Sequence, residues 1–360
     1  MAKRIFNFSA GPATLPLSVL EQVQAELLDF QGSGMSLMEM SHRGKIFDAV
    51  YKDSIERLRR IAAIPDDFDI LYMTGGASTQ FTLIPLNLKQ SGKAGYINTG
   101  AWSKKAMGQA KILNMAVNEL ASSAESNHNH IPQIPAIPAD LDYVHLTSNN
   151  TIFGTQFSDF PQSPVPLCVD MSSDFLSRPI DWSKMSLVYA GMQKNAGPAG
   201  VTVVILRKDL YARESAETPT IWRYSTFGEN ESMYNTPPTF QIYIFGLILK
   251  WIEDEMGGLQ GVAAHNQKKA QAIYNVIDQY PDFFVGHARK DSRSLMNITW
   301  NYANADLNPV FVQESEANGM SGLKGHRSVG GLRASIYNAM SLAGCEELAQ
   351  RMLAFHKQHA

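Results

Sequence analysis

Lys194 lies in a loop rich in glycine and proline, between two apolar runs. The sequence around it, residues 187 to 206, reads LVYAGMQKNAGPAGVTVVIL. Both runs have the composition of strands buried on both faces, so the loop leaves the edge of a core. A lysine that is removed from water there loses proton affinity and can act as a nucleophilic amine. Most loop lysines are simply solvated, so Lys194 needs a partner elsewhere in the chain.

Asp170 is the candidate partner, because it closes another apolar run, PLCVD, at the expected end of a strand. By itself such a residue can simply cap the following segment, MSSDF. A lysine that forms a Schiff base and an aspartate that faces a pyridinium nitrogen are, however, the two protein groups that pyridoxal 5′-phosphate requires. Trp102, in NTGAW, offers a flat face for the ring, although ordinary core packing also explains it. Together the three residues fit one ligand.

The loop TGGASTQF, residues 74 to 81, follows an apolar run and precedes a helical pattern. Glycines in this position let backbone N–H groups approach a phosphate, and the helix N-terminus adds partial positive charge. A tight turn is the alternative, and a double glycine alone favours neither. The loop matches neither G-x-G-x-x-G nor G-x-x-x-x-G-K-[ST], so neither a dinucleotide nor a nucleoside triphosphate is indicated.

Short β-like runs alternate with helical patterns from about residue 15 to 260. This alternation predicts an α/β fold with a mostly parallel sheet covered on both faces, in a large domain spanning residues 16–260. Ligands of such sheets bind beyond the carboxyl ends of the strands. The candidate residues all follow β-like runs, and we expect them at that edge: Gly75-Gly76, Trp102, Thr151, Asp170 and Lys194.

A smaller α+β domain is expected from residues 261–360 together with 1–15. The amphipathic stretch 251–277 predicts a helix, broken near Gly257-Gly258, that carries the chain out of the large domain. Beyond it, strand-like and helical patterns alternate, and EELAQRMLAFHKQ closes the domain as a helix. The proline-rich segment 122–140 is expected to be a surface loop. Its His128 and His130 lack a Cys or carboxylate at metal spacing, so no metal site is predicted.

Composition limits the classes of partner. The chain has 360 residues, of which 31 are basic and 34 acidic, and this balance gives no reason to expect nucleic acid or an anionic membrane. The longest apolar segment, FQIYIFGLILKWI, is too short and polar to span a bilayer, and the N-terminus has no signal-peptide pattern. The two cysteines, Cys168 and Cys345, are far apart. Reduced thiols in a cytoplasmic protein are expected.

Several long sequence segments resemble the motifs of one family. FNFSAGPATLP, SHRGKIFD, YAGMQKNAGPAG, NTPPTF and KGHRSVGGLRASIYNAM are similar to the motifs of phosphoserine aminotransferases, which are pyridoxal-phosphate-dependent enzymes of fold type I. The resemblance runs from about residue 4 to the C-terminus in the same motif order. It implies a homodimer that transfers an amino group reversibly between L-glutamate and 3-phosphohydroxypyruvate, giving O-phospho-L-serine and 2-oxoglutarate for serine biosynthesis. The family also accepts a phosphorylated threonine-like substrate, 4-phosphohydroxythreonine, in pyridoxine biosynthesis.

The resemblance implies roles for individual residues toward the cofactor. Lys194 in MQKN resembles the Schiff-base lysine, Asp170 would pair with the pyridine nitrogen, and Trp102 would stack on the ring. Thr151 in NNTIFG would bond the phenolic oxygen. The cofactor phosphate would be held by Ala77, Ser78 and Gln193 and, from the second subunit, by Asn235 and Thr236.

Substrate recognition follows from charge, since a substrate with a phosphate and a carboxylate needs two separated cationic sites. By resemblance, Arg333 in GGLRAS would anchor the α-carboxylate, and Ser9 in FNFSAGP would be a further substrate contact. The clamp for the phosphate, or for the side-chain carboxylate of glutamate, would comprise His42, Arg43, His326 and Arg327. Some family members carry an arginine where this chain has Ser78, so that contact is missing here.

Two other functions fit parts of the pattern. A different fold-type I enzyme, such as an alanine–glyoxylate-type aminotransferase or a desulfurase, would keep the cofactor and change the reaction. A desulfurase needs a mobile cysteine, whereas Cys168 lies in a strand and Cys345 near the last helix. A non-catalytic cofactor-binding regulator is disfavoured, because no DNA-binding segment is appended and the lysine, aspartate and arginine set is complete.

Overall fold

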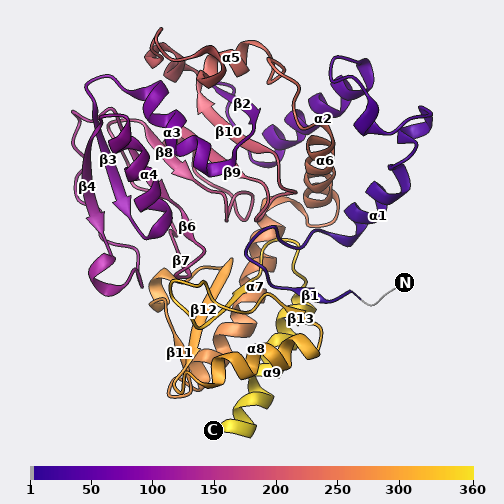
Figure 1. Cartoon of the computed structure of the whole chain (residues 1–360), viewed down its shortest axis with the longest axis vertical. Coiled ribbons are helices and arrows are strands. Elements are labelled where there is room, and N and C mark those ends of the chain that lie inside the picture. The colour runs from indigo at the N-terminus through magenta and orange to yellow at the C-terminus, as the bar shows by residue number, and fades with distance from the viewer. Residues whose placement is uncertain (1–3) are drawn as a thin grey trace.

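A computed structural model describes residues 4–360 and contains a central seven-stranded sheet (Figure 1). The strand order is β2-β10-β9-β8-β5-β3-β4, and only β10 runs antiparallel to its neighbours. The predicted α/β fold with a mostly parallel sheet is confirmed. The strands are β2 (Phe68–Met73), β3 (Lys93–Asn98), β4 (Ala116–Ser122), β5 (Tyr143–Thr147), β8 (Leu167–Asp170), β9 (Leu187–Gly191) and β10 (Thr202–Arg207).

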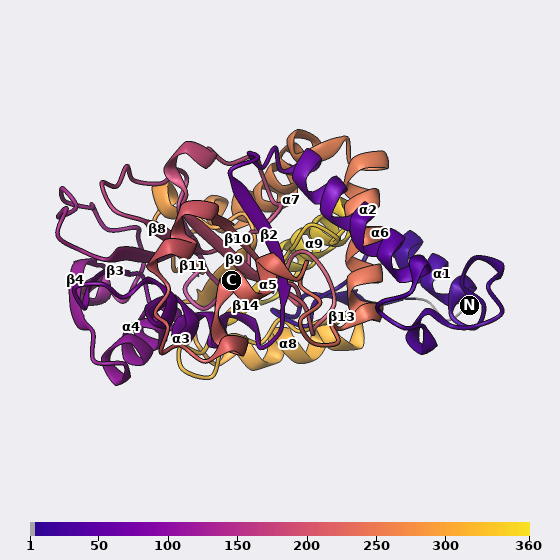
Figure 2. The ribbon, with the colours of Figure 1, turned by 90° about the horizontal axis from the view of Figure 1, so that it is seen from above.

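Helices cover both faces of this sheet (Figure 2). Successive strand residues point to opposite faces, so Ile70 and Tyr72 of β2 pack into one core while Leu71 and Met73 pack into another. The first core includes residues of α2 and α6, and the second includes residues of α3, α4 and α5. The helices of this part are α1 (Leu17–Glu26), α2 (Lys45–Ile61), α3 (Gly76–Leu88), α4 (Ala101–Ile112), α5 (Tyr224–Glu229) and α6 (Thr239–Asp254).

The long helix α7 (Gly258–Gln279) leads into a third, smaller core (Figure 1). Its first turns pack with the large sheet through Val262, whereas Ile273 packs in the smaller core. The predicted helix break is confirmed, since α6 ends at Asp254 and α7 starts at Gly258. The limits 16–260, and 261–360 with 1–15, stay a prediction. The remaining elements are β6 (Asn149–Asn150), β7 (Thr155–Gln156), β11 (Phe284–Gly286), β12 (Asn297–Tyr302), α8 (Leu307–Ala317), β14 (Leu332–Ser335) and α9 (Leu342–His359).

The N-terminal segment belongs with the small core. Strand β1 (Phe6–Asn7) pairs in parallel with β13 (Met320–Ser321), and Phe8 is fully buried there. From β1 the chain crosses toward the large sheet before α1 begins (Figure 1). The segment therefore passes between the two parts of the molecule.

Some side chains differ from the sequence expectation. His128, expected in a surface loop, is 4% exposed, and burial lowers its pKa to about 4. Both cysteines are buried and unbridged, as expected. Within residues 4–360, no helix has both the length and the apolar character that crossing a membrane requires.

Candidate active site

The glycine loop, Asp170 and the Lys194 loop open at the same edge of the sheet. Strands β8 and β9 are parallel, with Asp170 opposite Tyr189. The chain leaves β9 at Gly191 and reaches Lys194 three residues later. Thr202 of β10 pairs with both Gly191 and Met73, the last residue of β2 before the glycine loop. Strand register therefore brings together segments far apart in the sequence.

Lys194 and Asp170 stabilise each other's charge, whereas burial disfavours the charged form of both side chains. Removal from water lowers the pKa of the partly buried Lys194, and Asp170 opposes this shift. Burial raises the pKa of Asp170, while Lys194 and Ser172 lower it. The N–H and hydroxyl of Ser172 donate to Asp170 Oδ1 at 3.0 and 2.7 Å. The carboxylate is thus fixed in place, and the amine is held nearer its neutral form.

Trp102 lies beside the amine of Lys194, whose Nζ is 4.7 Å from the ring centroid. The indole N–H donates to Thr151 Oγ1 at 3.1 Å, and Thr151 is 2% exposed. The backbone oxygen of Thr151 accepts a hydrogen bond from Arg333 Nη1 at 2.9 Å. Arg333 Nε is buried and has no hydrogen-bond partner among residues 4–360. An aromatic face, a hydroxyl and an incompletely paired guanidinium therefore adjoin Lys194.

The glycine loop shapes the N-terminus of α3. Gly75 has φ +89°, and a Cβ atom there would lie 1.9 Å from Thr79 Oγ1, so glycine is required. The Gly76 N–H donates to Thr202 Oγ1 at 2.8 Å, which fixes the helix start on β10. Ala77 and Ser78 follow in the first turn of the helix, where backbone N–H groups lack intrahelical acceptors.

The N-terminal segment packs closely on the Lys194 loop. A Cβ atom added to Gly11, which has φ +139°, would lie 3.2 Å from Lys194 Cγ. The Ala13 N–H donates to the carbonyl oxygen of Gln193 at 3.1 Å. Ser9 lies two residues before Gly11 on this segment, and its N–H donates to Asn7 Oδ1 at 3.0 Å. Ser9 and Gln193 are therefore brought near the site by the same close passage.

The structure does not gather every predicted residue within one chain. His326 lies near Arg333: burial, followed by the charges of Arg333 and Arg327, lowers its pKa. The predicted residues Arg43, Asn235 and Arg327 are exposed. Within residues 4–360, no hydrogen bond or ion pair joins Lys194 or Asp170 to the predicted site residues His42, Arg43, Asn235 or Thr236.

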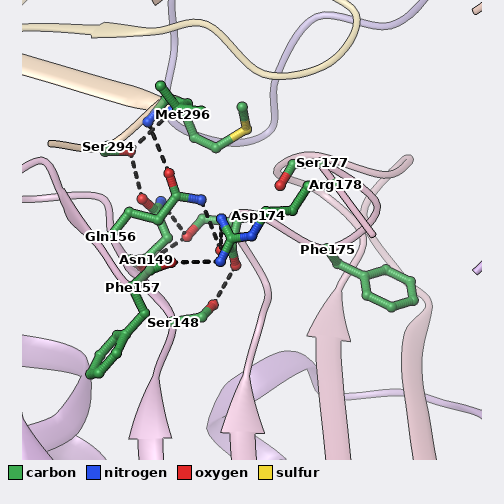
Figure 3. Close-up of polar contacts among 12 residues, drawn as sticks. Ser148, Asn149, Gln156, Phe157, Asp174, Phe175, Ser177, Arg178, Ser294 and Met296 are labelled. Atoms are coloured by element: carbon green, nitrogen blue, oxygen red, sulfur yellow. Dashed lines mark hydrogen bonds and ion pairs between the residues drawn. The ribbon is translucent and has the colours of Figure 1, made fainter. Parts of the chain in front are cut away.

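Asp174, a carboxylate with 0% exposure, is a residue that sequence reasoning missed (Figure 3). Ser148 Oγ donates to its Oδ1, Gln156 Nε2 donates to its Oδ2 at 3.0 Å, and Arg178 lies 3.7 Å away as an ion-pair partner. Ser148 Oγ also lies 3.0 Å from the backbone oxygen of Asp170. The only feature of the sequence that could have indicated this residue is its acidic type, four positions after Asp170.

The same network reaches the small core. Gln156 Oε1 accepts a hydrogen bond from the Leu295 N–H at 2.9 Å. Asn149 donates to Asn297 Oδ1 at 2.8 Å. It also accepts a hydrogen bond from Ser294 Oγ at 2.5 Å (Figure 3). Since β12 begins at Asn297 and pairs with β14, which carries Arg333, the network connects the Asp170 strand end with the Arg333 strand.

Comparison with known proteins places this site in a family. The aminotransferase class-V family model matches residues 5–348. The phosphoserine aminotransferase of Desulfatibacillum aliphaticivorans is 54% identical over 361 residues, which is 100% of both chains. This chain belongs to the phosphoserine aminotransferase family. The resemblance inferred from its motifs is therefore confirmed, and the chain is an aminotransferase.

Solved structures of the family have the same fold. Phosphoserine aminotransferase from Bacillus circulans subsp. alkalophilus has a TM-score of 0.96 and 50% identity, covering 99% of each chain. The PLP-bound phosphoserine aminotransferase from Trichomonas vaginalis has a TM-score of 0.92 and 41% identity, covering 97% of this chain and 100% of that chain. These likenesses over the full length favour the phosphoserine branch over an alanine–glyoxylate-type aminotransferase.

Proposed function

We propose that this chain catalyses reversible amino transfer between L-glutamate and 3-phosphohydroxypyruvate, giving O-phospho-L-serine and 2-oxoglutarate. The observation that carries the proposal is the Lys194–Asp170 pair beside Arg333 and His326, in a chain of this family. The phosphorylated threonine-like substrate, 4-phosphohydroxythreonine, offers the same charged groups to the site. We further propose a cytoplasmic location, in keeping with two buried, unbridged cysteines.

The residues present fit pyridoxal 5′-phosphate. The buried Asp170 carboxylate suits a protonated ring nitrogen, because a buried charge needs a partner of opposite sign. Thr151 Oγ1 accepts from Trp102 and keeps its own hydrogen for the phenolic oxygen. The free N–H groups of the first turn of α3 suit the phosphate. We assign that phosphate to Ala77, Ser78, Gln193 and, from a second subunit, Asn235 and Thr236.

Lys194, Asp170 and Arg333 have separate roles in the reaction. When bound, pyridoxal 5′-phosphate supplies an electron-accepting ring that stabilises negative charge at the substrate Cα. Lys194 Nζ takes the Cα proton and later returns a proton, and its lowered pKa favours the neutral, basic form. The Asp170 carboxylate would accept a hydrogen bond from the protonated ring nitrogen and so keep that proton in place. Arg333 binds the α-carboxylate of either substrate, so the Cα atom occupies the same position in both half-reactions.

Specificity rests on a cationic clamp. A phosphomonoester carries about −1.5 to −2 charge at neutral pH and offers three acceptor oxygens. We assign these oxygens to His42, Arg43, His326 and Arg327, with Ser9 as a further substrate contact. Arg43 and Arg327 are exposed, and no ion pair engages either within residues 4–360. They are therefore free to bind an anion.

We propose a homodimer in which Asn235 and Thr236 reach the cofactor phosphate of the partner. Three large apolar side chains are exposed: Tyr234 (45%) directly before Asn235, Trp222 (43%) earlier in the same segment, and Leu28 (84%) upstream of the His42 motif. A second subunit packed over these segments would cover these side chains and remove their apolar surface from water. Mixing Lys194→Ala with Asn235→Ala/Thr236→Ala should restore partial activity. Hybrid dimers that form but stay inactive would return these residues to their own subunit's site.

A comparison of substrates tests the function itself. The specificity constant kcat/KM of the purified protein should be far higher for O-phospho-L-serine than for L-serine or L-alanine, and L-glutamate should change its visible absorption spectrum. Lys194→Ala should be inactive. Equal values for phosphorylated and unphosphorylated amino acids would contradict the proposed substrate and leave an unspecific aminotransferase.

A further inference from the structure

Lys105, on α4 three residues after Trp102, is a cation near the site with no role in the mechanism above. Its Nζ lies 4.5 Å from the Trp102 ring centroid, and Lys194 Nζ lies 4.7 Å from the same centroid. The two amines are therefore no more than 9.2 Å apart, the sum of these distances. Lys105 is exposed, and within residues 4–360 it pairs with no carboxylate.

The charge of Lys105 acts on groups from both parts of the molecule. It contributes to lowering the pKa of Lys194, after the effects of burial and Arg333, and that of His326, after burial, Arg333 and Arg327. Trp102 is in turn joined through Thr151 to Arg333 by hydrogen bonds of 3.1 and 2.9 Å. Lys105 is therefore one of several cations around the place where the substrate binds.

These cations carry like charges and therefore repel one another. No carboxylate of residues 4–360 forms an ion pair with Lys105, Arg327 or Arg333 that would offset this repulsion. Such a cluster attracts an anion with more than one negative charge. The glycine loop, residues 74–79, offers no charged side chain for it. Lysine is a compact charge on a flexible four-carbon stem, so it can exchange a weak contact with a half-buried indole for an ion pair.

We propose that Lys105 is a specificity-determining residue whose ammonium leaves the Trp102 face and donates to the phosphate of the substrate. This inference rests on the proposed function, since it requires a phosphorylated substrate in the site. Lys105 comes from α4 over the large sheet, whereas His326 and Arg327 come from the loop before β14 in the small part. The phosphate would thus be held from both parts of the chain.

Single-turnover rates with O-phospho-L-serine, L-glutamate and L-alanine test the inference in the holoenzyme. Lys105→Gln should lower the specificity constant for O-phospho-L-serine at least about tenfold, since it removes one charge-assisted hydrogen bond. The loss should be smaller for L-glutamate and absent for L-alanine, and Lys105→Arg should keep most of the activity. The control is Lys104→Gln, which changes the neighbouring exposed lysine of the same helix and should behave as the unmodified enzyme.

Two results would overturn the role of Lys105 while leaving the proposed function intact. Equal losses for all three substrates would mean that Lys105 only supports the Trp102 ring. A Lys105→Gln variant as active on O-phospho-L-serine as Lys104→Gln would mean that Lys105 does not touch the phosphate. An unmodified enzyme with no preference for O-phospho-L-serine over L-alanine would instead overturn the proposed function, and this inference with it.

Discussion

The backbone N–H of Asn338 donates to Oδ1 of Asn195 at 2.9 Å. Asn195 directly follows Lys194, and its Nδ2 donates to the carbonyl oxygen of Phe175 at 2.6 Å. Both asparagines are buried, at 6% and 2% exposure. One side chain therefore ties the Lys194 loop to the segment after β8 and to the chain that leaves β14.

Asn195→Ala should release this loop. Losing two buried hydrogen bonds should cost about 1–3 kcal/mol of stability, because two backbone groups are left unpaired. The turnover number kcat should fall more than KM rises, since Lys194 would be held less firmly. Urea unfolding and steady-state kinetics measure the two effects, with Asn304→Ala in an exposed turn as the control. A stability loss with unchanged kcat would limit Asn195 to a purely structural role.

Asp170→Asn should slow proton abstraction while keeping the shape of the site. The variant removes the negative charge that the ring nitrogen needs, and a charge-assisted hydrogen bond is worth about 1.5–3 kcal/mol. The rate should therefore fall by roughly one to two orders of magnitude or more. Single-turnover kinetics with L-glutamate measure the rate, with Asp181→Asn, on an exposed helix cap, as the matched control. Unchanged kinetics would move Asp170 to a structural role.

The sheet was predictable because its strands are short apolar runs followed by helical periodicity. The antiparallel strand β10 departs from the repeated strand–helix pattern for a geometric reason. Only residues 192–201 separate β9 from β10, which is too few for the crossover that a parallel pair requires. The loop length carries this information, but the composition of VTVVIL does not, since an apolar run suits either direction.

The location of Asp170 and Lys194 could be predicted, because each follows a strand whose carboxyl end faces the ligand edge. The contacts of Asp174 and Asn195 could not be predicted in this way. Gln156, the partner of Asp174, meets a backbone group 139 residues away, and Asn195 meets one 143 residues away. Such contacts depend on how the small core docks against the sheet, and no local pattern records that docking.

Asp174→Asn should weaken the junction between the two cores. Its new amide would place a donor opposite the Gln156 Nε2 donor, which now bonds Asp174 Oδ2 at 3.0 Å. Stability should fall by about 1–3 kcal/mol, and KM should rise for both amino acids because Arg333 is displaced relative to Asp170. Unfolding by urea and steady-state kinetics measure these changes.

Adding Gln156→Glu should restore part of both losses, because donor and acceptor then exchange places. Gln156→Glu alone is the matched control, since it sets two carboxylates against each other and should be worse than Asp174→Asn. A double variant whose loss is simply the sum of the single losses would show that the pair does not act as a unit.

The buried Lys269 should give the protein a characteristic pH dependence. It has 0% exposure, its Nζ donates to the carbonyl oxygens of Ile336 and Tyr337 at 2.8 and 2.6 Å, and burial lowers its pKa from 10.5 to about 7. Between these values the unfolded chain binds a proton that the folded chain lacks. The contribution of Lys269 to stability therefore rises with pH from about 7 to 10.5, by up to about 1.4 kcal/mol per pH unit.

Comparison of the unmodified protein with Lys269→Met isolates the contribution of Lys269 to the free energy of unfolding. The difference in unfolding free energy between the two should grow as pH rises from 7 to 10.5 and stay constant below 7. Lys268→Met, at the exposed neighbouring position, should show no such trend. Parallel stability curves for the unmodified protein and Lys269→Met would contradict the lowered pKa.

Arg333 and Arg327 should differ in which substrates they serve. Arg333 is partly buried and fixed by Thr151, and both amino acids present it with the same α-carboxylate. Arg333→Ala should therefore lower kcat/KM for O-phospho-L-serine and L-glutamate by similar factors. Arg327 is exposed on the loop before β14, where a dianionic phosphate engages more donors than a single carboxylate. Arg327→Ala should cost O-phospho-L-serine about tenfold to a hundredfold, and L-glutamate less.

The ratio of the two specificity constants is the decisive measurement, because it cancels any general loss of folded enzyme. The ratio should stay near that of the unmodified enzyme in Arg333→Ala and should fall in Arg327→Ala. Arg207→Ala, which breaks an exposed pair with Asp209, is the control and should change neither constant. If Arg333→Ala changed the ratio as strongly as Arg327→Ala, the α-carboxylate and the phosphate would share one site. The assignment of two separate anion sites would then be wrong.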